Sequence, residues 1–379
     1  MQLVAYGAQD IYLTGNPQIT FFKVVYRRHT NFSMEAIEQT WNGSHNTNGR
    51  CTATISRNGD LVHRMYLELT GTTAAATDNL CAGITDVELE IGGQKIDKHS
   101  GKWMEVWAEL TEPNPNGTVA LCAAPQITGT KFQRMSGMGG VRHGGAVIHS
   151  FIPLQFWFCR NPGLALPLIA LQYHEVKVIL THKLAETIDV GLNNKLWADY
   201  IYLDTDERRR FAQVSHEYLI EQVQEQSLSA TKTNDLNFNH PVKELIWSSA
   251  TPGATVGATL VTPFAAGSTA HIKLNGHDRF SARDSRYFTR TQIWQHHTGG
   301  GGLDSTTGAG DGHSNDSIAV YSFALKPEEH QPSGTCNFSR IDNAQLITSE
   351  ALEANSHIYA VNYNVLRIMS GMGGLAYSN

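Results

Sequence analysis

Short stretches in which apolar and polar residues alternate recur along the whole chain. Such alternation puts the apolar side chains on one face of an extended backbone, which is typical of a half-buried β-strand. Turns rich in Gly, Pro and Asn separate the stretches, a combination that indicates a β-sandwich or barrel. We predict strands at residues 18–26, 51–55, 61–69, 173–180, 196–203, 218–223, 234–238, 242–247, 270–274, 318–325 and 358–368.

One hairpin and one helix can be placed more closely. Asn58-Gly59 separates the strands expected at 51–55 and 61–69, and an Asn-Gly pair favours the tight turn of a β-hairpin. Residues 102–110 instead carry Trp and aliphatic side chains at helical spacing, so we predict a short helix there.

The same strand-turn-strand pattern occurs twice, at residues 86–96 and 270–280. The first copy turns at Gly93 and the second at Gly276, which are 276 − 93 = 183 residues apart. A separation close to half of the 379 residues indicates two copies of one all-β domain. A chain with two similar halves suits assembly better than catalysis.

A charge-rich segment at residues 204–215 marks the expected boundary between the copies. We place the first domain at 1–210, with an amino-terminal segment at 1–17, and the second at 211–379. Two domains also agree with the length, because one hydrophobic core seldom supports so long a chain.

Composition narrows the class of protein. Charged residues make up only 17% of the chain, against a typical quarter, so either much of the surface lies in interfaces or uncharged polar side chains cover it. The net charge of −6 predicts no direct binding to nucleic acid. The five cysteines are widely spaced and form no Cys-x-x-Cys motif, which favours reduced thiols. The sequence contains neither a secretion signal nor an apolar run of membrane-spanning length, so we expect neither secretion nor a membrane span.

Catalytic motifs are missing. The sequence has no Gly-x-Ser-x-Gly, no phosphate-binding Gly-Lys-Thr and no His-x-His with a following Glu, the pattern of cupin-type metalloenzymes. His296-His297 is the one adjacent histidine pair; it precedes a glycine-rich loop, and we predict an exposed pair without a metal. We expect no enzyme, no cofactor and no metal site.

A basic cluster lies near the amino terminus, on or just after the first expected strand. It consists of Lys23, Arg27, Arg28 and His29. The cluster is either a solvated strand end or a contact for an acidic partner or membrane surface.

Five Asn-x-Ser/Thr matches occur, and most are expected by chance in a chain with no secretion signal. We keep Asn42, Asn116 and Asn315 as candidate glycosylation sites.

Long loops are expected at residues 111–145 and 298–316, which are rich in glycine and small residues. Loops of this length cannot be buried without leaving backbone groups unpaired, so we place them on the outer surface. The stretch Ser-Gly-Met-Gly-Gly at 136–140 recurs at 370–374, a repetition for which the sequence offers no physical reason.

Residues 3–23 closely resemble the start of the major capsid proteins of large icosahedral DNA viruses, most of all those of the phycodnaviruses that infect chlorella. The resemblance recurs over nearly the whole chain and departs from the family in the loops at 111–145, 251–269 and 298–316. The matching segments are residues 86–98, 162–178, 204–221, 236–241, 321–343 and 362–377.

This resemblance implies a double jelly roll: two tandem eight-stranded antiparallel sandwiches. It also implies three chains in a pseudo-hexagonal capsomer of an icosahedral virion, with minor capsid proteins and an inner viral membrane beneath the shell, and assembly in the host cytoplasm. The basic cluster would then face the interior. The alternative from another class is a glycan-binding jelly-roll module, for which Trp294 beside the glycine-rich loop is the candidate aromatic side chain.

Overall fold

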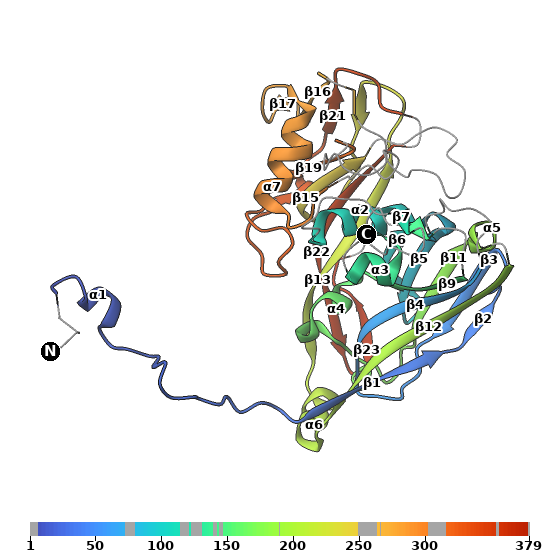
Figure 1. Cartoon of the computed structure of the whole chain (residues 1–379), viewed down its shortest axis with the longest axis vertical. Helices are drawn as coiled ribbons and strands as arrows, with labels where there is room; N and C mark the ends of the chain where they lie inside the picture. Colours follow the sequence, from blue (N-terminus) through green and yellow to red (C-terminus); the bar gives the residue numbers. More distant parts are fainter. Residues whose placement is uncertain are drawn as a thin grey trace.

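The computed structural model describes residues 7–72, 80–113, 121–122, 131–138, 142–143, 147–188, 190–248, 264–265, 267–301, 316–353 and 356–377. Two β-sandwiches lie against each other, and an extended arm leaves the first of them (Figure 1). Both sandwiches are built from antiparallel sheets, so the all-β class predicted from the alternating pattern is confirmed.

The first sandwich pairs two five-stranded sheets. One sheet has the order β1-β12-β4-β10, with β9 also paired to β4; the other has the order β2-β3-β11-β5-β6. The strands are β1 (Phe32–Gln39), β2 (Trp41–Gly43), β3 (Gly49–Thr54), β4 (Leu61–Thr72), β5 (Ile84–Ile91), β6 (Gln94–Ser100), β9 (Val147–Pro153), β10 (Leu166–Pro167), β11 (Val176–His182) and β12 (Val190–Leu203). A short parallel pair, β7 (Leu121–Cys122) and β8 (Arg142–His143), lies in the connection before β9.

The second sandwich repeats this order. One sheet runs β13-β22-β15-β19 and the other β14-β21-β16-β17. The strands are β13 (His216–Ser227), β14 (Thr233–Asp235), β15 (Pro241–Ser248), β16 (Thr269–Leu274), β17 (His277–Asp278), β18 (Arg283–Asp284), β19 (Ile318–Ser322), β20 (Cys336–Asn337), β21 (Ala344–Thr348), β22 (His357–Met369) and β23 (Met372–Leu375). In both sandwiches the first, eighth, third and sixth main strands form one sheet, and the second, seventh, fourth and fifth form the other. This is the jelly-roll topology, present twice.

The matched turns seen in the sequence occupy equivalent places. Gly92-Gly93 joins β5 to β6, and Asn275-Gly276 joins β16 to β17. The φ angles are 59° and 84° in the first turn and 49° and 78° in the second. Two successive positive φ angles define the type I′ turn, which glycine and asparagine tolerate. The prediction of equivalent turns in the two halves is therefore confirmed.

Helices are short and, apart from α1 before the first strand, lie in the connections between strands. The predicted helix at 102–110 is confirmed as α2 (Gly101–Thr111), and the Ser100 side chain caps it by accepting a hydrogen bond from the Trp103 backbone N–H. The other helical segments are α1 (Ile11–Thr14), α3 (Lys131–Ser136), α4 (Trp157–Arg160), α5 (Leu184–Thr187), α6 (Thr205–Gln213), α7 (Gln292–His296), η1 (Leu80–Gly83), η2 (Pro162–Leu164), the π-helix η3 (Tyr287–Thr291) and η4 (Phe338–Arg340).

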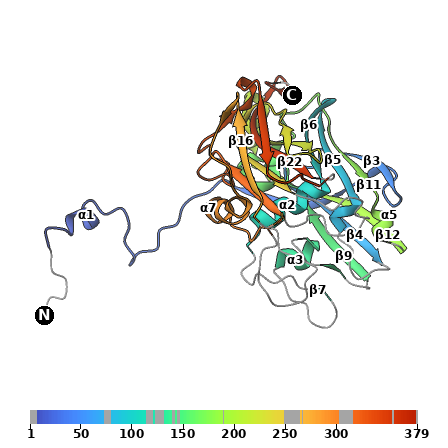
Figure 2. The same ribbon diagram turned by 90° about the horizontal axis from the view of Figure 1, so that it is seen from above.

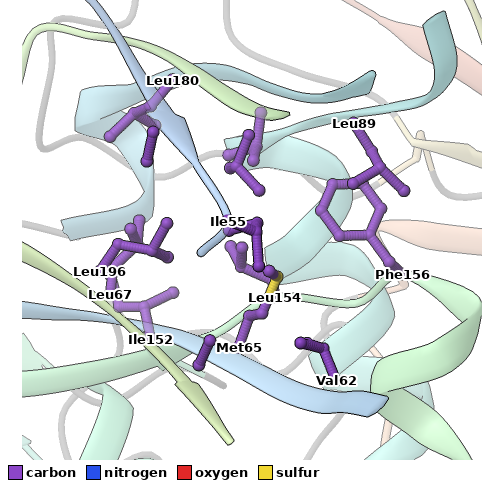
Figure 3. Close-up of a cluster of buried hydrophobic side chains, with 14 of the residues drawn as sticks. Ile55, Val62, Met65, Leu67, Leu89, Ile152, Leu154, Phe156, Leu180 and Leu196 are labelled. Carbon is purple, nitrogen blue, oxygen red and sulfur yellow. The ribbon is translucent and has the colours of Figure 1, made fainter. Parts of the chain in front are cut away.

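Each jelly roll has its own apolar core. Alternate residues of β4, among them Met65, Leu67 and Leu69, point into the first core together with residues of β5, β11 and β12 (Figure 3). The second core gathers around Leu245, Trp247 and neighbouring strands. Truncating one such buried leucine to alanine typically costs about 2–5 kcal/mol. No helix in the described part of the chain combines the length and the apolar character that crossing a bilayer requires.

The predicted hairpin at Asn58-Gly59 is wrong. Both strands form, but β3 pairs with β2 and β11 while β4 pairs with β12 and β9, so the connection crosses from one sheet to the other. Gly59 is required for close approach, because a Cβ there would lie 2.7 Å from the Tyr200 Cβ. The Asn-Gly turn therefore connects a strand of one sheet to a strand of the other sheet.

The strand predicted at residues 18–26 is also wrong. These residues form no strand in the structure, and β1 begins only at Phe32. The β-branched and aromatic composition that suggested a strand is present, but none of the strands in the described ranges lies alongside to complete the hydrogen bonds.

Candidate functional site at the junction of the two jelly rolls

Helix α2 of the first jelly roll packs on the second one (Figures 1 and 2). We name the face of sheet β13-β22-β15-β19 that points away from its own core the second outer face. The α2 side chains Trp103 and Trp107 join this face in one buried cluster, and the Trp103 and Tyr359 rings lie 5.0 Å apart. The remaining members are Val106, Leu110, Ile246, Ile293, Ile318, Val320 and Val361. An apolar contact of this kind holds the two jelly rolls as one body.

The second jelly roll also caps the carboxyl end of α2. The Thr298 hydroxyl donates to the Thr111 carbonyl at 2.8 Å, and the Gly299 N–H donates to the Leu110 carbonyl at 2.7 Å. A Cβ on Gly299 would lie 2.4 Å from the Glu109 carbonyl oxygen, so only glycine fits. The last carbonyls of a helix need outside donors, and here they come from the other jelly roll.

A buried carboxylate collects basic groups at the same junction. The Glu221 carboxylate lies 2.8 Å from Lys243 Nζ, 3.0 Å from Arg160 and 3.3 Å from the His330 ring. Burial by itself would raise the pKa of Glu221, but the His330 hydrogen bond and the charges of Lys243 and Arg160 lower it to about 2. Arg160 comes from the first jelly roll and also stacks 4.4 Å above the Trp107 ring. The network therefore ties α4 and α2 to β13 and β15 by charge.

His297 forms a second buried ionic contact. Its Nε2 lies 2.9 Å from Glu244 Oε2 and its Nδ1 lies 3.0 Å from Glu328 Oε1. Burial would lower the pKa of His297, but the two carboxylates raise it to about 9. The same Glu328 accepts from the Thr298 backbone N–H, so His297 anchors the segment that caps α2.

The prediction of an exposed His296-His297 pair is therefore wrong for one member. His296 is partly exposed and contacts the Leu325 carbonyl, whereas His297 is buried between two carboxylates that are distant in the sequence. The carboxylates approach opposite ring nitrogens, so the ring bridges them, which is no arrangement for a shared metal ion. Within the described residues, no group of three or more His, Cys, Asp and Glu side chains could hold a metal.

The hairpin between β22 and β23 makes a third contact with the first jelly roll. The Tyr173 N–H donates to the Gly371 carbonyl at 3.0 Å, and the Leu375 N–H donates to the Gln94 side chain at 3.2 Å. A Cβ on Gly373 would lie 2.6 Å from the Leu171 side chain. In the second Ser-Gly-Met-Gly-Gly stretch, Gly371 and Gly373 are thus required for close packing. In the first stretch Met138 is buried in the core, while Gly139 and Gly140 lie outside the described residues.

The basic cluster lies far from this junction. Lys23, Arg27, Arg28 and His29 are exposed on the segment before β1, which we name the amino-terminal arm (residues 7–31; Figures 1 and 2). The His29 ring contacts the Thr30 carbonyl and the Phe32 ring. The arm also exposes large apolar side chains: Ile11, Tyr12, Leu13, Ile19, Phe21, Phe22, Val24, Val25 and Tyr26. Apolar and basic side chains together make the arm a candidate contact segment.

Of the three candidate glycosylation sites, the structure places one. Asn42 is exposed on β2, an edge strand that pairs with β3. Asn116 and Asn315 lie outside the described residues. Most of the loops predicted on the outer surface at 111–145 and 298–316 also lie outside them.

Sequence reasoning missed the buried ionic network. The sequence did contain one signal of this network: the adjacent charges Lys243-Glu244 lie inside the apolar run at 242–247. Charged side chains in a buried strand require buried partners. Glu221 and His297 gave no such local signal, since their partners are distant in the sequence. The junction therefore joins the two domains firmly through buried apolar and ionic contacts.

Two family profiles together cover nearly the whole chain. "Major capsid protein N-terminus" matches residues 20–204, and "Large eukaryotic DNA virus major capsid protein" matches residues 207–374. The major capsid protein of Pyramimonas orientalis virus is 53% identical, with 100% of this chain and 99% of that protein aligned. The major capsid protein of Paramecium bursaria Chlorella virus 1 is 42% identical over the same shares of both chains.

Solved structures agree. A quasi-atomic model of the PBCV-1 virus capsid contains a chain that superposes with a TM-score of 0.75 at 38% identity, covering 95% of this chain and 100% of that one. The Faustovirus major capsid protein superposes with a TM-score of 0.63 at 13% identity, covering 96% of this chain and 94% of that one. The second likeness shows a shared fold alone.

Proposed function

The chain belongs to the major capsid proteins of large eukaryotic DNA viruses, a structural and non-enzymatic family of the icosahedral virion shell, and we propose that it builds this shell as a homotrimer with a pseudo-hexagonal outline. The observation that carries the proposal is the repeated strand order of the two jelly rolls. Three chains supply six similar domains, so identical trimers can tile a hexagonal lattice.

The expected contacts differ in size. An obligate interface within the trimer buries roughly 2,000–5,000 Å². Contacts between trimers can be smaller, because many weak contacts act together in a closed shell. The native mass of the purified protein tests the proposal: we expect three times the chain mass of 41.7 kDa, and a folded protein that stays monomeric at micromolar concentration contradicts it.

We further propose that the amino-terminal arm faces the particle interior and contacts minor capsid proteins or the inner viral membrane. The arm combines exposed apolar side chains with Lys23, Arg27, Arg28 and His29, whereas the whole chain carries a net charge of −6. Each basic residue near an anionic membrane surface contributes about 1 kcal/mol of attraction. The overall acidic charge supports a shell protein that does not bind nucleic acid directly.

The double variant Arg27→Gln/Arg28→Gln tests the arm. We expect intact trimers and impaired assembly of particles on the membrane, because the arm makes no contact with the jelly-roll cores. Arg209→Gln/Arg340→Gln removes the same charge from exposed positions on the two domains and should assemble normally. Loss of trimers in the first variant, or binding of an antibody against residues 7–16 to intact particles, contradicts an inward-facing arm.

We also propose assembly in the host cytoplasm, which the thiol chemistry supports. Burial raises the pKa of the Cys51 and Cys159 thiols to about 12, so neither Cys51 in the core nor the partly buried Cys159 is a reactive thiolate. Such thiols suit a reducing compartment. Immunogold labelling of infected cells should find the newly made protein outside the secretory pathway.

Asn42 is the candidate glycan acceptor that the fold supports, because its side chain is exposed on an edge strand. We propose that it is modified in the virion. Replacement by Gln should lower the mass of virion-derived protein by one glycan, and an unchanged mass contradicts the assignment. Asn116 and Asn315 remain predictions of the sequence and can be tested by the same replacement.

A further inference from the structure

We propose that Trp294 of one copy docks into a cavity on the first jelly roll of the next copy, and that this head-to-tail contact closes the trimer. The inference rests on the proposed homotrimer and assigns the two surfaces that form it. Two positions are compared: the contact that the two jelly rolls make within one chain, and the equivalent position, which the described part of the chain leaves uncovered.

The filled position lies on the second outer face. There a row of paired residues crosses three strands, from Tyr359 on β22 to Ile246 on β15 and Val320 on β19. All three are fully buried, because α2 of the first jelly roll covers them with Trp103 and Trp107. The helix that covers this face is the first one after the fifth main strand of its own jelly roll.

The open position lies on the equivalent surface of the first jelly roll, which we name the first outer face. The equivalent strands are β12, β4 and β9, and the equivalent row runs from Trp197 to Tyr66 and Pro153. These side chains are only partly buried. A cavity of about 740 Å³ opens beside them. Its lining includes Tyr66, Phe151, Phe132, Met135, Arg64 and Asp199, and it extends to Trp107, Arg160 and Glu328 of the junction.

The piece that would fill the cavity is found on the second jelly roll. Its first helical segment after the fifth main strand is η3 followed by α7, the counterpart of α2. Helix α7 buries Ile293 at the junction but leaves Trp294 80% exposed. Leu325, which is 76% exposed, lies close by, because its carbonyl contacts the His296 ring. A tryptophan this exposed is unusual, and tryptophan is enriched at the centres of protein interfaces.

A second copy of this chain is therefore the occupant to which the repeated architecture points. Each copy offers a tryptophan on its second jelly roll and a cavity on its first, so the contact is heterologous. Repeating it would continue around a ring of alternating first and second jelly rolls, and three chains would close the ring with six. The contact between copies would then imitate the contact within a chain.

Two variants on opposite sides of the contact test this assignment. Trp294→Ala removes the inserted side chain, and Phe151→Asp places a charge in the cavity. We expect each to weaken self-association about thirtyfold or more, the loss typical of a buried interface aromatic, as measured by sedimentation velocity. Circular dichroism should show both still folded, since Trp294 and Phe151 lie outside the two cores. Tyr12→Ala, at an 89% exposed position on the amino-terminal arm, should leave trimers unchanged.

A mixture of the two variants gives the sharpest result. Trp294 of the Phe151→Asp chain can still enter the intact cavity of the Trp294→Ala chain, but the reverse contact is broken at both ends. The mixture should therefore form dimers of twice 41.7 kDa that cannot close into trimers. If the wild type and both single variants are all trimeric, the assignment of these two surfaces is wrong but the proposed homotrimer is correct. A monomeric wild-type protein would overturn both.

Discussion

Two regions of the molecule place polar and apolar side chains in opposite ways. The junction of the two jelly rolls buries charged side chains, whereas the amino-terminal arm exposes apolar ones. At the junction Lys243 and Glu221 are 0% and 5% exposed, whereas on the arm Phe21 and Phe22 are 93% and 97% exposed. The buried charges find their partners within one chain. The apolar side chains of the arm have no core to enter. The junction is therefore complete when a single chain folds, and the arm is suited to contacts made on assembly.

This difference separates two kinds of mutational effect. Changes at the junction should lower the stability of the isolated chain, because removing one member of a buried ionic contact leaves the other member uncompensated. Changes on the arm should leave the isolated chain unaffected and act only on the particle.

The largest effect is expected for Glu221→Gln. This replacement leaves Lys243 fully buried without its carboxylate and also removes the negative charge that faces Arg160 and His330. We expect a loss of about 3–5 kcal/mol in the free energy of unfolding, measured by denaturant titration. Glu175→Gln, which removes an exposed contact with Lys177, should cost less than about 1 kcal/mol. Equal losses for the two variants would show that the junction gains nothing special from its charges.

The second largest expected effect is a loss of folding stability at alkaline pH. The folded-state pKa of His297 is raised to about 9 from an ordinary value of 6.5, so the protonated ring stabilises the fold fully below pH 6.5 and this stabilisation disappears as pH rises through 9. The difference amounts to about 3 kcal/mol. Burial lowers the pKa of Lys102 to about 8, which acts in the opposite direction over part of this range.

The contribution of His297 to stability is therefore measured as the difference in unfolding free energy between the wild type and a variant that lacks the imidazole. The gap in unfolding free energy between the wild type and His297→Gln should narrow between pH 6.5 and pH 9.5. His296→Gln, at the partly exposed neighbour, should keep the wild-type profile. A constant gap across this range would mean that His297 is not charged in the folded chain.

A smaller effect is expected at the cap of α2. Gly299→Ala would bring a Cβ to 2.4 Å from the Glu109 carbonyl oxygen, so the capping segment must move away from the helix. Overpacking of this kind typically costs about 1–3 kcal/mol. The nearest atom to a Cβ on Gly374 is the Gln94 side chain at 3.4 Å, so Gly374→Ala should be nearly neutral. The pair can be compared by thermal unfolding, and a neutral Gly299→Ala would show that the cap is dispensable.

The sequence predicted the fold better than it predicted the contacts between parts. Alternation and the matched turns at Gly93 and Gly276 were sufficient for two similar all-β halves, because both signals are local. Asn58-Gly59 misled, since a turn motif does not say which sheet the next strand joins. Glu221 and His297 could not be assigned to the junction, because their partners lie tens to more than a hundred residues away and are brought together only by the folded chain. The arm showed the limit of propensity: residues 18–26 favour a strand but lack a neighbour.

The smallest effect on the isolated chain should come from the arm, and it is the most informative about assembly. Phe21→Ser/Phe22→Ser removes two large apolar side chains that are almost fully exposed. Because nothing packs on them, the free energy of unfolding of the chain should change by less than about 0.5 kcal/mol. If the arm contacts minor capsid proteins or the inner membrane, the same variant should still form trimers but give few particles in infected cells, because the lost apolar area is buried only on assembly. Thr14→Ser, a mild change on the same arm, controls for altered expression. Normal particle yield from the double variant would show that these side chains have no partner in the shell. The proposed contrast, in which the junction is completed within one chain and the arm only on assembly, would then be wrong.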